Sequence, residues 1–173
     1  MADQKTLVIY YSRSGTTRQI AQALANALYA DTEEIVATGN RSGVLGYLRC
    51  VLEARRRAPA AIAASKKNPS AYDLVLIGTP VWAWSLSSPV RAWLMANSSR
   101  LPAVGFFCTL GGAGSDKAFS QMQDIAGKAP RACLALTAAD VTAQRYTAAL
   151  AQFVQQLGSP ASVNATPRTI TAA

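Results

Sequence analysis

The fold is decided by the stretch Thr6-Leu7-Val8-Ile9-Tyr10-Tyr11, which is followed by Ser12-Arg13-Ser14-Gly15-Thr16-Thr17. The first six residues predict a buried strand, and the apolar residues of 17–28 recur at helical spacing. The junction between strand and helix contains four hydroxyls and one glycine. Because the first amide groups of a helix are unpaired and its dipole favours an anion, this junction predicts a phosphate site.

The glycine pattern of this loop excludes two better-known phosphate-binding loops. A dinucleotide-binding turn reads G-x-G-x-x-G, and a nucleoside-triphosphate loop reads G-x-x-x-x-G-K-[ST]. Here one glycine precedes the helix and no lysine follows it, so a single terminal phosphate monoester is the expected ligand. The alternative is an N-cap cluster that satisfies the helix end and binds nothing.

Length and composition limit the classes of protein to which this chain can belong. A chain of 173 residues is long enough for one well-buried domain and too short for two ordinary ones. No run approaches the roughly 18 apolar residues of a membrane span, and the N-terminus lacks a signal-peptide pattern, so a cytoplasmic location is expected. The absence of histidine removes the usual general base and the Ser-His-Asp type of hydrolase.

The three cysteines are scattered in apolar contexts, at Cys50, Cys108 and Cys133. An odd and unclustered set of this kind favours reduced core thiols over a disulfide framework. With no histidine and no cysteine cluster, we expect no metal site.

The rest of the chain alternates between predicted strands and helices. Further strands are predicted near Glu34–Val36 and at Tyr72–Gly78, Ala103–Thr109 and Ala132–Leu136, and further helices at Pro89–Met95, Asp116–Ala126 and Thr142–Leu157. This alternation predicts an α/β fold with an open parallel sheet, covered by helices on both faces and wound by right-handed crossovers. Ligands of such sheets bind beyond the carboxyl ends of the strands.

Three loops are predicted to meet at that edge of the sheet: Ser12–Thr17, Thr79–Ser88 and Thr109–Ser115. The second loop carries two tryptophans, and the third is rich in glycines that expose backbone amides. A planar heteroaromatic ring fits between such loops, because tryptophan offers a stacking face. The alternatives are packing of the tryptophans against the sheet edge and tight-turn geometry for the glycines.

Together these loops resemble the flavodoxin-like FMN-binding family, in its bacterial flavodoxin and NAD(P)H-dependent oxidoreductase branch, over roughly residues 5–157. Ser12, Ser14, Gly15 and Thr17 match the family's phosphate-binding pattern in register, and Gly78–Trp82 with Ser88–Leu94 resembles its second flavin-contacting loop. The resemblance implies a flavodoxin-like three-layer sandwich with a five-stranded parallel sheet in the order 2-1-3-4-5. It also implies FMN as the cofactor.

The resemblance further implies which residues hold FMN. The phosphate would be bound by Ser12, Arg13, Ser14, Gly15, Thr16 and Thr17. The isoalloxazine ring would be bordered by Pro80, Val81, Trp82, Ala83, Trp84, Thr109, Leu110, Gly111, Gly112 and Gly114. No side chain is nominated as a catalytic acid or base.

Two departures from electron-carrier flavodoxins indicate an enzyme. The loop Thr109–Ser115 contains no aromatic residue, which would leave one flavin face open to a substrate or a nicotinamide ring. Pro80–Trp84 contains no glycine, so a peptide flip beside the flavin would force a non-glycine residue to positive φ, which favours two-electron chemistry. We therefore expect an FMN-dependent oxidoreductase that passes electrons between NAD(P)H or a protein donor and a small acceptor such as a quinone. A flavodoxin-type electron carrier and a non-catalytic binding module are the alternatives.

The formal net charge is +8, and the segment 39–71 holds +6 of it. An amphipathic helix is predicted within this insertion by the apolar residues of 44–52. The segment could be a crossover helix with a solvated basic end, a lid, a homodimer contact or a surface for anionic lipid. Its arginines could attract an anionic substrate or an acidic redox protein. No nucleic-acid-binding module accompanies the charge, so nucleic acid is not the expected partner.

The domain is expected to span 1–157. Residues 158–173 are rich in Ser, Thr, Pro and Ala, and we expect this C-terminal tail to be loosely ordered.

Overall fold

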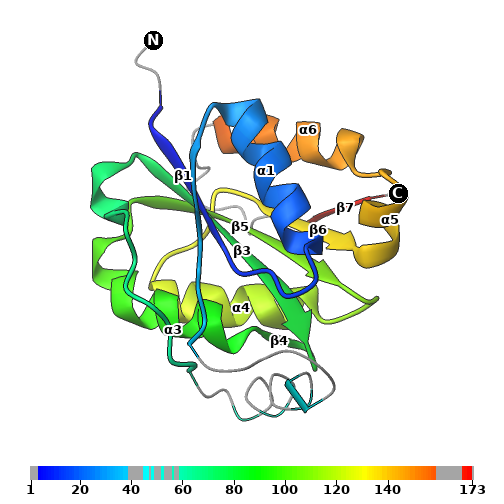
Figure 1. The fold of residues 1–173 in the computed structure, drawn as a ribbon. Helices are drawn as coiled ribbons and strands as arrows, with labels where there is room; N and C mark the ends of the chain where they lie inside the picture. Colours follow the sequence, from blue (N-terminus) through cyan, green and yellow to red (C-terminus); the bar gives the residue numbers. More distant parts are fainter. Residues whose placement is uncertain are drawn as a thin grey trace.

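The computed structural model describes residues 4–38, the single positions 45, 46, 48, 52 and 56, residues 59–158 and residues 169–172. A central sheet is covered on one face by α1, α5 and α6 and on the other by α3 and α4, as expected for a three-layer sandwich (Figure 1). The helices are α1 (Thr16–Leu28), α3 (Ser88–Asn97), α4 (Ser115–Ala126), α5 (Ala138–Thr142) and α6 (Thr147–Gly158), with short 3-10 turns η1 (Pro69–Ala71) and η2 (Ser98–Arg100). The strands are β1 (Thr6–Tyr10), β2 (Asp31–Glu34), β3 (Leu74–Trp82), β4 (Ser85–Leu86), β5 (Ala103–Leu110), β6 (Cys133–Thr137) and β7 (Thr169–Thr171).

The strand order of the sheet is β2-β1-β3-β5-β6-β7, and all neighbours in that path are parallel. Its first five strands reproduce the predicted order 2-1-3-4-5. Among the described residues the sheet has a sixth parallel strand, β7, and a short antiparallel strand, β4, which pairs with β3. The expectation of exactly five strands was therefore wrong, although the flavodoxin-like sandwich is confirmed.

The added parallel strand comes from the expected C-terminal tail. Thr169–Thr171 pairs with β6 from Cys133 to Ala135, and Ile170 is buried against the layer that contains α6. One apolar residue between two β-branched threonines is too short a pattern to predict a strand. Residues 159–168, which belong to the same predicted tail, lie outside the described residues.

Two other boundaries differ from the prediction. The second strand is Asp31–Glu34 rather than Glu34–Val36, because an edge strand needs only one partner for its backbone and tolerates a polar sequence. The closing helix is divided into α5 and α6, with Gln144 at φ 55° between them. The side chain of Thr137 caps the first of these helices and makes it begin directly after β6.

The predicted insertion at 39–71 is described only in part. Leu45, Leu48 and Leu52 are helical, and their side chains are exposed, whereas most of the predicted amphipathic helix lies outside the described residues. Farther along, Ile62 bridges Ala37 in antiparallel fashion beyond the end of β2. The carboxylate of Glu33 accepts hydrogen bonds from the amides of Lys66 and Lys67, at 2.8 Å each.

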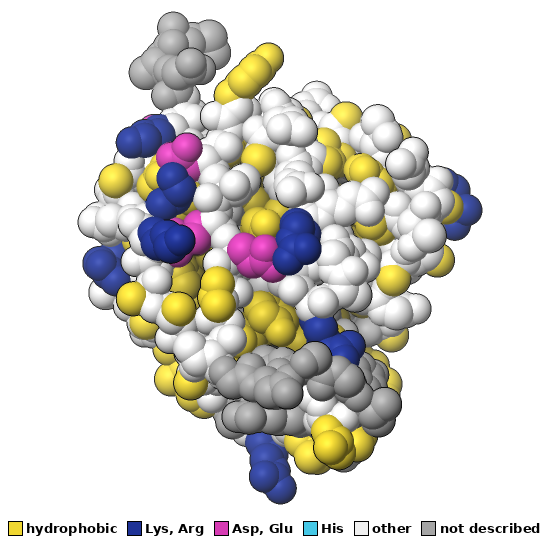
Figure 2. All heavy atoms as spheres, in the orientation of Figure 1, with side chains coloured by type: hydrophobic (Ala, Val, Ile, Leu, Met, Phe, Trp, Pro, Cys, Tyr) yellow, Lys and Arg dark blue, Asp and Glu magenta, His cyan; other side chains and the backbone are white. Residues whose placement is uncertain are grey.

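Charged side chains are paired near the edge formed by β2. Arg18 contacts Glu34 at 2.8 Å, and Lys67 contacts Asp31 at 3.3 Å. Figure 2 shows basic and acidic side chains lying side by side on this face of the molecule. The pKa of Asp31 is lowered by hydrogen bonds from Tyr72 and Lys67.

The core consists of two apolar clusters, one on each face of the sheet. Strands β1, β3, β5 and β6 are apolar on both faces, as expected for the centre of a parallel sheet. Cys108 and Cys133 are buried free thiols, which confirms the prediction for these two residues, while Cys50 lies outside the described residues. Burial raises the pKa of Cys133 to about 12 and that of Cys108 further still, so both are expected to be unreactive.

No helix in the described parts of the chain is both long enough and apolar enough to cross a membrane.

The centre of the sheet should not tolerate a side chain at Gly78. A Cβ atom there would lie 2.1 Å from Cζ of Phe107, whose ring is fully buried and cannot move away. Gly78→Ala should lower the free energy of unfolding by about 1–3 kcal/mol through overpacking, as measured by urea titration. The control is Gly158→Ala, where no described atom from outside the local helix backbone lies within 4 Å of the new Cβ; it should change stability by less than about 0.5 kcal/mol. Equal stabilities of the two variants would contradict this account.

Candidate functional site

A cavity of about 260 Å³ lies at the carboxyl ends of the central strands. Ten of the sixteen residues predicted to hold the cofactor line it, and they come from all three predicted loops: Arg13, Ser14, Thr16, Thr17, Pro80, Val81, Trp82, Thr109, Leu110 and Gly111. The other six belong to the same loops but do not line the cavity: Ser12, Gly15, Ala83, Trp84, Gly112 and Gly114. The structure thus brings the three loops around one space.

The first loop has the properties of an anion site. Gly15 caps α1 at φ 93°, a conformation that favours glycine, and no side chain caps the helix. The first turn of α1 contains no acidic residue. Its amide groups are therefore available to an anion, and the hydroxyls of Ser14 and Thr16, 3.2 Å apart, lie beside them. Ser12 is buried instead, and its hydroxyl accepts a hydrogen bond from the Gly15 amide at 3.1 Å, which shapes the loop.

A buried pair of hydroxyls joins the first loop to the third. Thr17 Oγ1 lies 2.7 Å from Thr109 Oγ1, and the two side chains are 1 % and 4 % exposed. Thr17 is at the start of α1 and Thr109 is near the end of β5, so this hydrogen bond sets the spacing of the two loops. Both threonines also line the cavity.

The second predicted loop is largely a β-hairpin. Strand β3 continues to Trp82, and a two-residue turn, Ala83–Trp84, leads into β4 with Trp82 opposite Ser85. Both turn residues have positive φ, at 47° and 58°. Hairpin turns of this kind normally use asparagine and glycine. We expected non-glycine residues to avoid positive φ here and on that basis favoured two-electron chemistry, but the turn adopts positive φ without a glycine.

The two tryptophans of the hairpin differ in their surroundings. Trp82 is half-buried, lines the cavity and packs edge-on against Tyr11, with ring centroids 5.9 Å apart. Trp84 is 60 % exposed at the tip of the hairpin and does not line the cavity. Trp82 is therefore the tryptophan that is placed to contact a bound ring.

The third loop packs against the hairpin turn. Gly114 has φ 107°, and a Cβ atom at this position would lie 2.8 Å from Cα of Trp84. Only glycine satisfies both constraints, which makes Gly114 a packing residue. Gly111 and Gly112 are exposed, with open space around them, and of the two only Gly111 lines the cavity.

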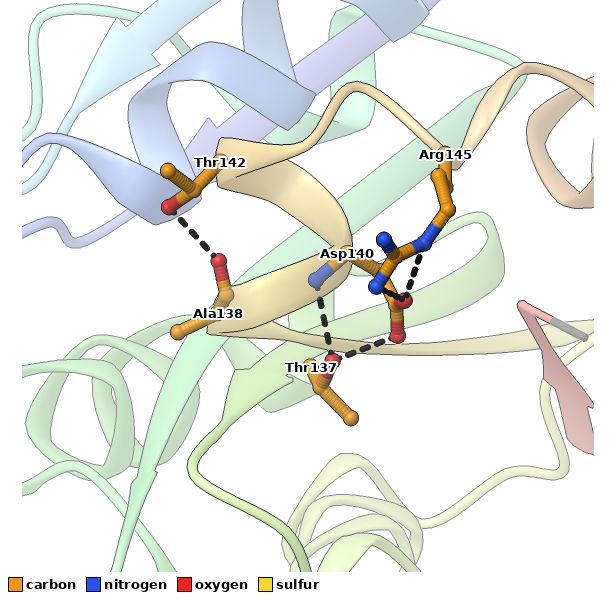
Figure 3. A network of polar contacts seen from close by, with 5 residues as sticks. All are labelled: Thr137, Ala138, Asp140, Thr142 and Arg145. Atoms are coloured by element: carbon orange, nitrogen blue, oxygen red, sulfur yellow. Dashed lines mark hydrogen bonds and ion pairs between the residues drawn. The ribbon is translucent and has the colours of Figure 1, made fainter.

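The junction between β6 and α5, which the sequence analysis missed, also reaches the cavity through Ala138, the first residue of α5. Figure 3 shows how its position is fixed: the Thr137 hydroxyl accepts a hydrogen bond from the Asp140 amide at 3.1 Å and donates one to the Asp140 carboxylate. Arg145 pairs with the same carboxylate at 3.0 Å. The hydrogen bond from Thr137, together with Arg145, lowers the pKa of Asp140. The spacing Thr137-x-x-Asp140 resembles a capping box, and this signal could have predicted a helix start here.

Two other cavities, of about 360 and 470 Å³, are both lined by residues of the segment 62–68. Both are larger than the first. Glu33, which borders the 360 Å³ cavity, is already bonded to Ser65, Lys66 and Lys67. None of the predicted loops reaches them. The cavity of about 260 Å³ between the three predicted loops, called the loop cavity below, is therefore the better candidate site. Within the described residues, no group of three or more acidic or cysteine side chains is arranged to hold a metal ion.

The fold and these loops define an α/β protein of the flavodoxin-like class. The family described as flavodoxin matches residues 5–145, and the chain belongs to that family, which confirms the resemblance seen in the loops. A comparison with curated proteins gives no match.

Solved structures show the same fold. A flavoprotein from Lactobacillus acidophilus, crystallised in complex with FMN, is 21 % identical, with a TM-score of 0.65 over 81 % of this chain and 97 % of that one. A protein from Bacteroides uniformis that is described as a flavoprotein is 21 % identical, with a TM-score of 0.71 over 88 % and 98 %. Another from Bacteroides eggerthii is 26 % identical, with a TM-score of 0.64 over 70 % and 80 %.

The hydroxyl pair Thr17–Thr109 should be energetically coupled. Thr17→Val should lower the free energy of unfolding by about 1–3 kcal/mol, because it leaves the buried Thr109 hydroxyl without this partner. Thr109→Val should behave in the same way, and the double variant should lose less than the sum of the two. A double-mutant cycle from urea titrations measures the coupling. Strict additivity would show that the two hydroxyls do not stabilise each other.

Proposed function

We propose that this protein binds FMN in the loop cavity and works as a flavin-dependent oxidoreductase. The observation that carries the proposal is the start of α1: its amide groups have no capping side chain, no acid lies in the first turn, and they face a cavity with an aromatic wall. The flavodoxin family match and the FMN complex of the Lactobacillus relative support the choice of FMN. The donor set fits a phosphate monoester joined to a planar ring.

Different residues of the cavity would bind different parts of FMN. The first-turn amides of α1, the hydroxyls of Ser14 and Thr16, and the exposed Arg13 would hold the phosphate. Trp82 would give the ring an aromatic surface, with Val81 and Leu110 as apolar walls that exclude water. The backbone of Gly111 would offer hydrogen bonds to the polar edge of the ring.

When bound, FMN supplies hydride or single-electron transfer, so the protein contributes position and electrostatics. No proton-transfer side chain is assigned, since the sequence has no histidine and Asp140 is engaged by Thr137 and Arg145. The proposed electron donor is NAD(P)H or a protein, and the proposed acceptor is a small molecule such as a quinone. An acidic redox protein would match the net charge of +8, and a cytoplasmic location is part of the proposal.

A flavodoxin-type electron carrier is the second candidate. The turn residues Ala83 and Trp84 favour this candidate, because both already have positive φ. The expected cost of that conformation for residues other than glycine was the reason to disfavour one-electron chemistry.

The phosphate site predicts discrimination between FMN and riboflavin, which differ by the phosphate. FMN should bind the purified full-length protein about 100-fold more tightly, because charge-assisted hydrogen bonds to the phosphate are lost with riboflavin. Fluorescence titration measures both Kd values. Arg13→Ala should raise the Kd for FMN about tenfold and leave the Kd for riboflavin unchanged. The control Arg100→Ala, outside this cavity, should change neither Kd. Equal Kd values for the two flavins would refute the phosphate site, and colourless protein that ignores added FMN would refute the function.

The proposed chemistry predicts reduction of the bound flavin by a nicotinamide. Under anaerobic conditions, NADH or NADPH should bleach the flavin absorbance of the FMN-loaded protein, and a quinone should restore it. A screen of quinone, nitro and azo acceptors would then identify the acceptor class, with the flavin-free protein as control. Flavin that binds tightly but is reduced by neither nicotinamide would favour the electron carrier instead.

A further inference from the structure

One wall of the loop cavity is held in place from outside the cavity. Val81 and Trp82 form part of that wall, and β4 pairs with them through Leu86 and Ser85. Between the two strands, the turn Ala83–Trp84 has positive φ at both residues without a glycine. Strained residues of this kind persist only where surrounding contacts impose their conformation. The hairpin therefore needs a support that fixes it.

Besides the packing of Gly114 against the turn, a polar cluster made of Ser85, Arg91 and Gln121 provides this support. Ser85 lies directly opposite Trp82 in the hairpin and is 4 % exposed. Its hydroxyl donates a hydrogen bond to Gln121 Oε1 at 2.7 Å and accepts one from Arg91 Nη2 at 3.2 Å. Arg91 Nη2 also donates to Gln121 Oε1, at 2.5 Å. The cluster thus ties the hairpin to α3, which carries Arg91, and to α4, which carries Gln121.

Because Arg91 is buried, the cluster stabilises the hairpin in one position only. Arg91 is only 6 % exposed, and a buried charge such as its guanidinium requires well-placed hydrogen-bond acceptors. Hydrogen bonds from a charged donor are stronger than those between neutral groups. A displaced hairpin would withdraw the Ser85 hydroxyl from this donor and from Gln121 together. The cluster therefore opposes movement of the strand that faces Trp82.

The base of the hairpin has its own hydrogen bond. The amide of Ser87 donates to Thr79 Oγ1 at 3.0 Å, and both side chains are fully buried. Loss of the cluster would therefore loosen the tip of the hairpin and leave its base in place. Variants in the cluster are expected to fold.

We propose that Arg91 is a positioning residue: through Ser85 and Gln121 it holds the strained turn, and with it the Trp82 ring, in the position that the cofactor cavity requires. The proposal rests on the proposed function for the identity of the ligand. None of the three cluster residues lines the cavity, so the cluster acts through the hairpin and not by contact with FMN.

A matched pair of substitutions at Gln121 tests the cluster in the full-length protein. Gln121→Glu keeps an acceptor oxygen for Ser85 and Arg91, whereas Gln121→Leu keeps a similar size and removes the acceptor. Gln121→Leu should raise the Kd for FMN about tenfold, and Gln121→Glu should stay within about twofold of the wild type. Without FMN, the near-ultraviolet circular dichroism, to which the Tyr11–Trp82 pair contributes, should change in Gln121→Leu and not in Gln121→Glu. Ser85→Ala should reproduce the effects of Gln121→Leu.

The proposal is overturned if Gln121→Leu and Gln121→Glu alter the Kd and the spectrum equally. It is also overturned if Ser85→Ala lowers the Tm but leaves both the spectrum and the Kd unchanged, since the cluster would then be only structural. A wild-type protein that binds no FMN refutes the proposed function instead. In that case the flavin-free spectra alone decide whether the cluster sets the position of the hairpin.

Discussion

The candidate site depends on the parallel pairing of the three central strands. Leu7 in β1 is opposite Val75 in β3, which is in turn opposite Val104 in β5. Because these strands run in one direction, the loops that follow them leave the sheet at the same edge. The pairing brings the start of α1 close enough to β5 for the hydroxyls of Thr17 and Thr109 to meet. The spacing of the cavity walls is thus a consequence of sheet geometry, fixed locally by one buried hydrogen bond.

The centre of the fold could be predicted because its strands are buried on both faces and leave continuous apolar runs in the sequence. The edges could not be predicted in the same way. Asp31–Glu34 is polar because, in the described sheet, one side of β2 has no strand partner, and Thr169–Thr171 is too short to show a period. The hairpin formed by β3 and β4 was also missed, since its turn, Ala83–Trp84, lacks the asparagine or glycine that normally marks such turns.

The candidate site could be predicted at the level of loops but less well at the level of residues. The chain order of β1, β3 and β5 was enough to place three loops together. It could not show that Trp82 lines the cavity while Trp84 is exposed at the hairpin tip, because the direction of a side chain depends on the hairpin register. Ala138 was missed for a different reason: an alanine has no chemistry of its own, and only the capping residues beside it indicate where α5 begins.

The two edges of the described sheet affect whether copies of the chain can associate by strand addition. Beyond β2, Thr38 donates its amide hydrogen bond to Ala61, and Ala63 donates to Val36, so the backbone of 36–38 is already paired. At the opposite edge of the described sheet, β7 is three residues long. Within the described residues, the strands at the two edges are only four residues (β2) and three residues (β7) long, so neither presents a long row of unpaired amides and carbonyls that could template a strand from another molecule. Edge-to-edge strand addition through these two strands is therefore disfavoured.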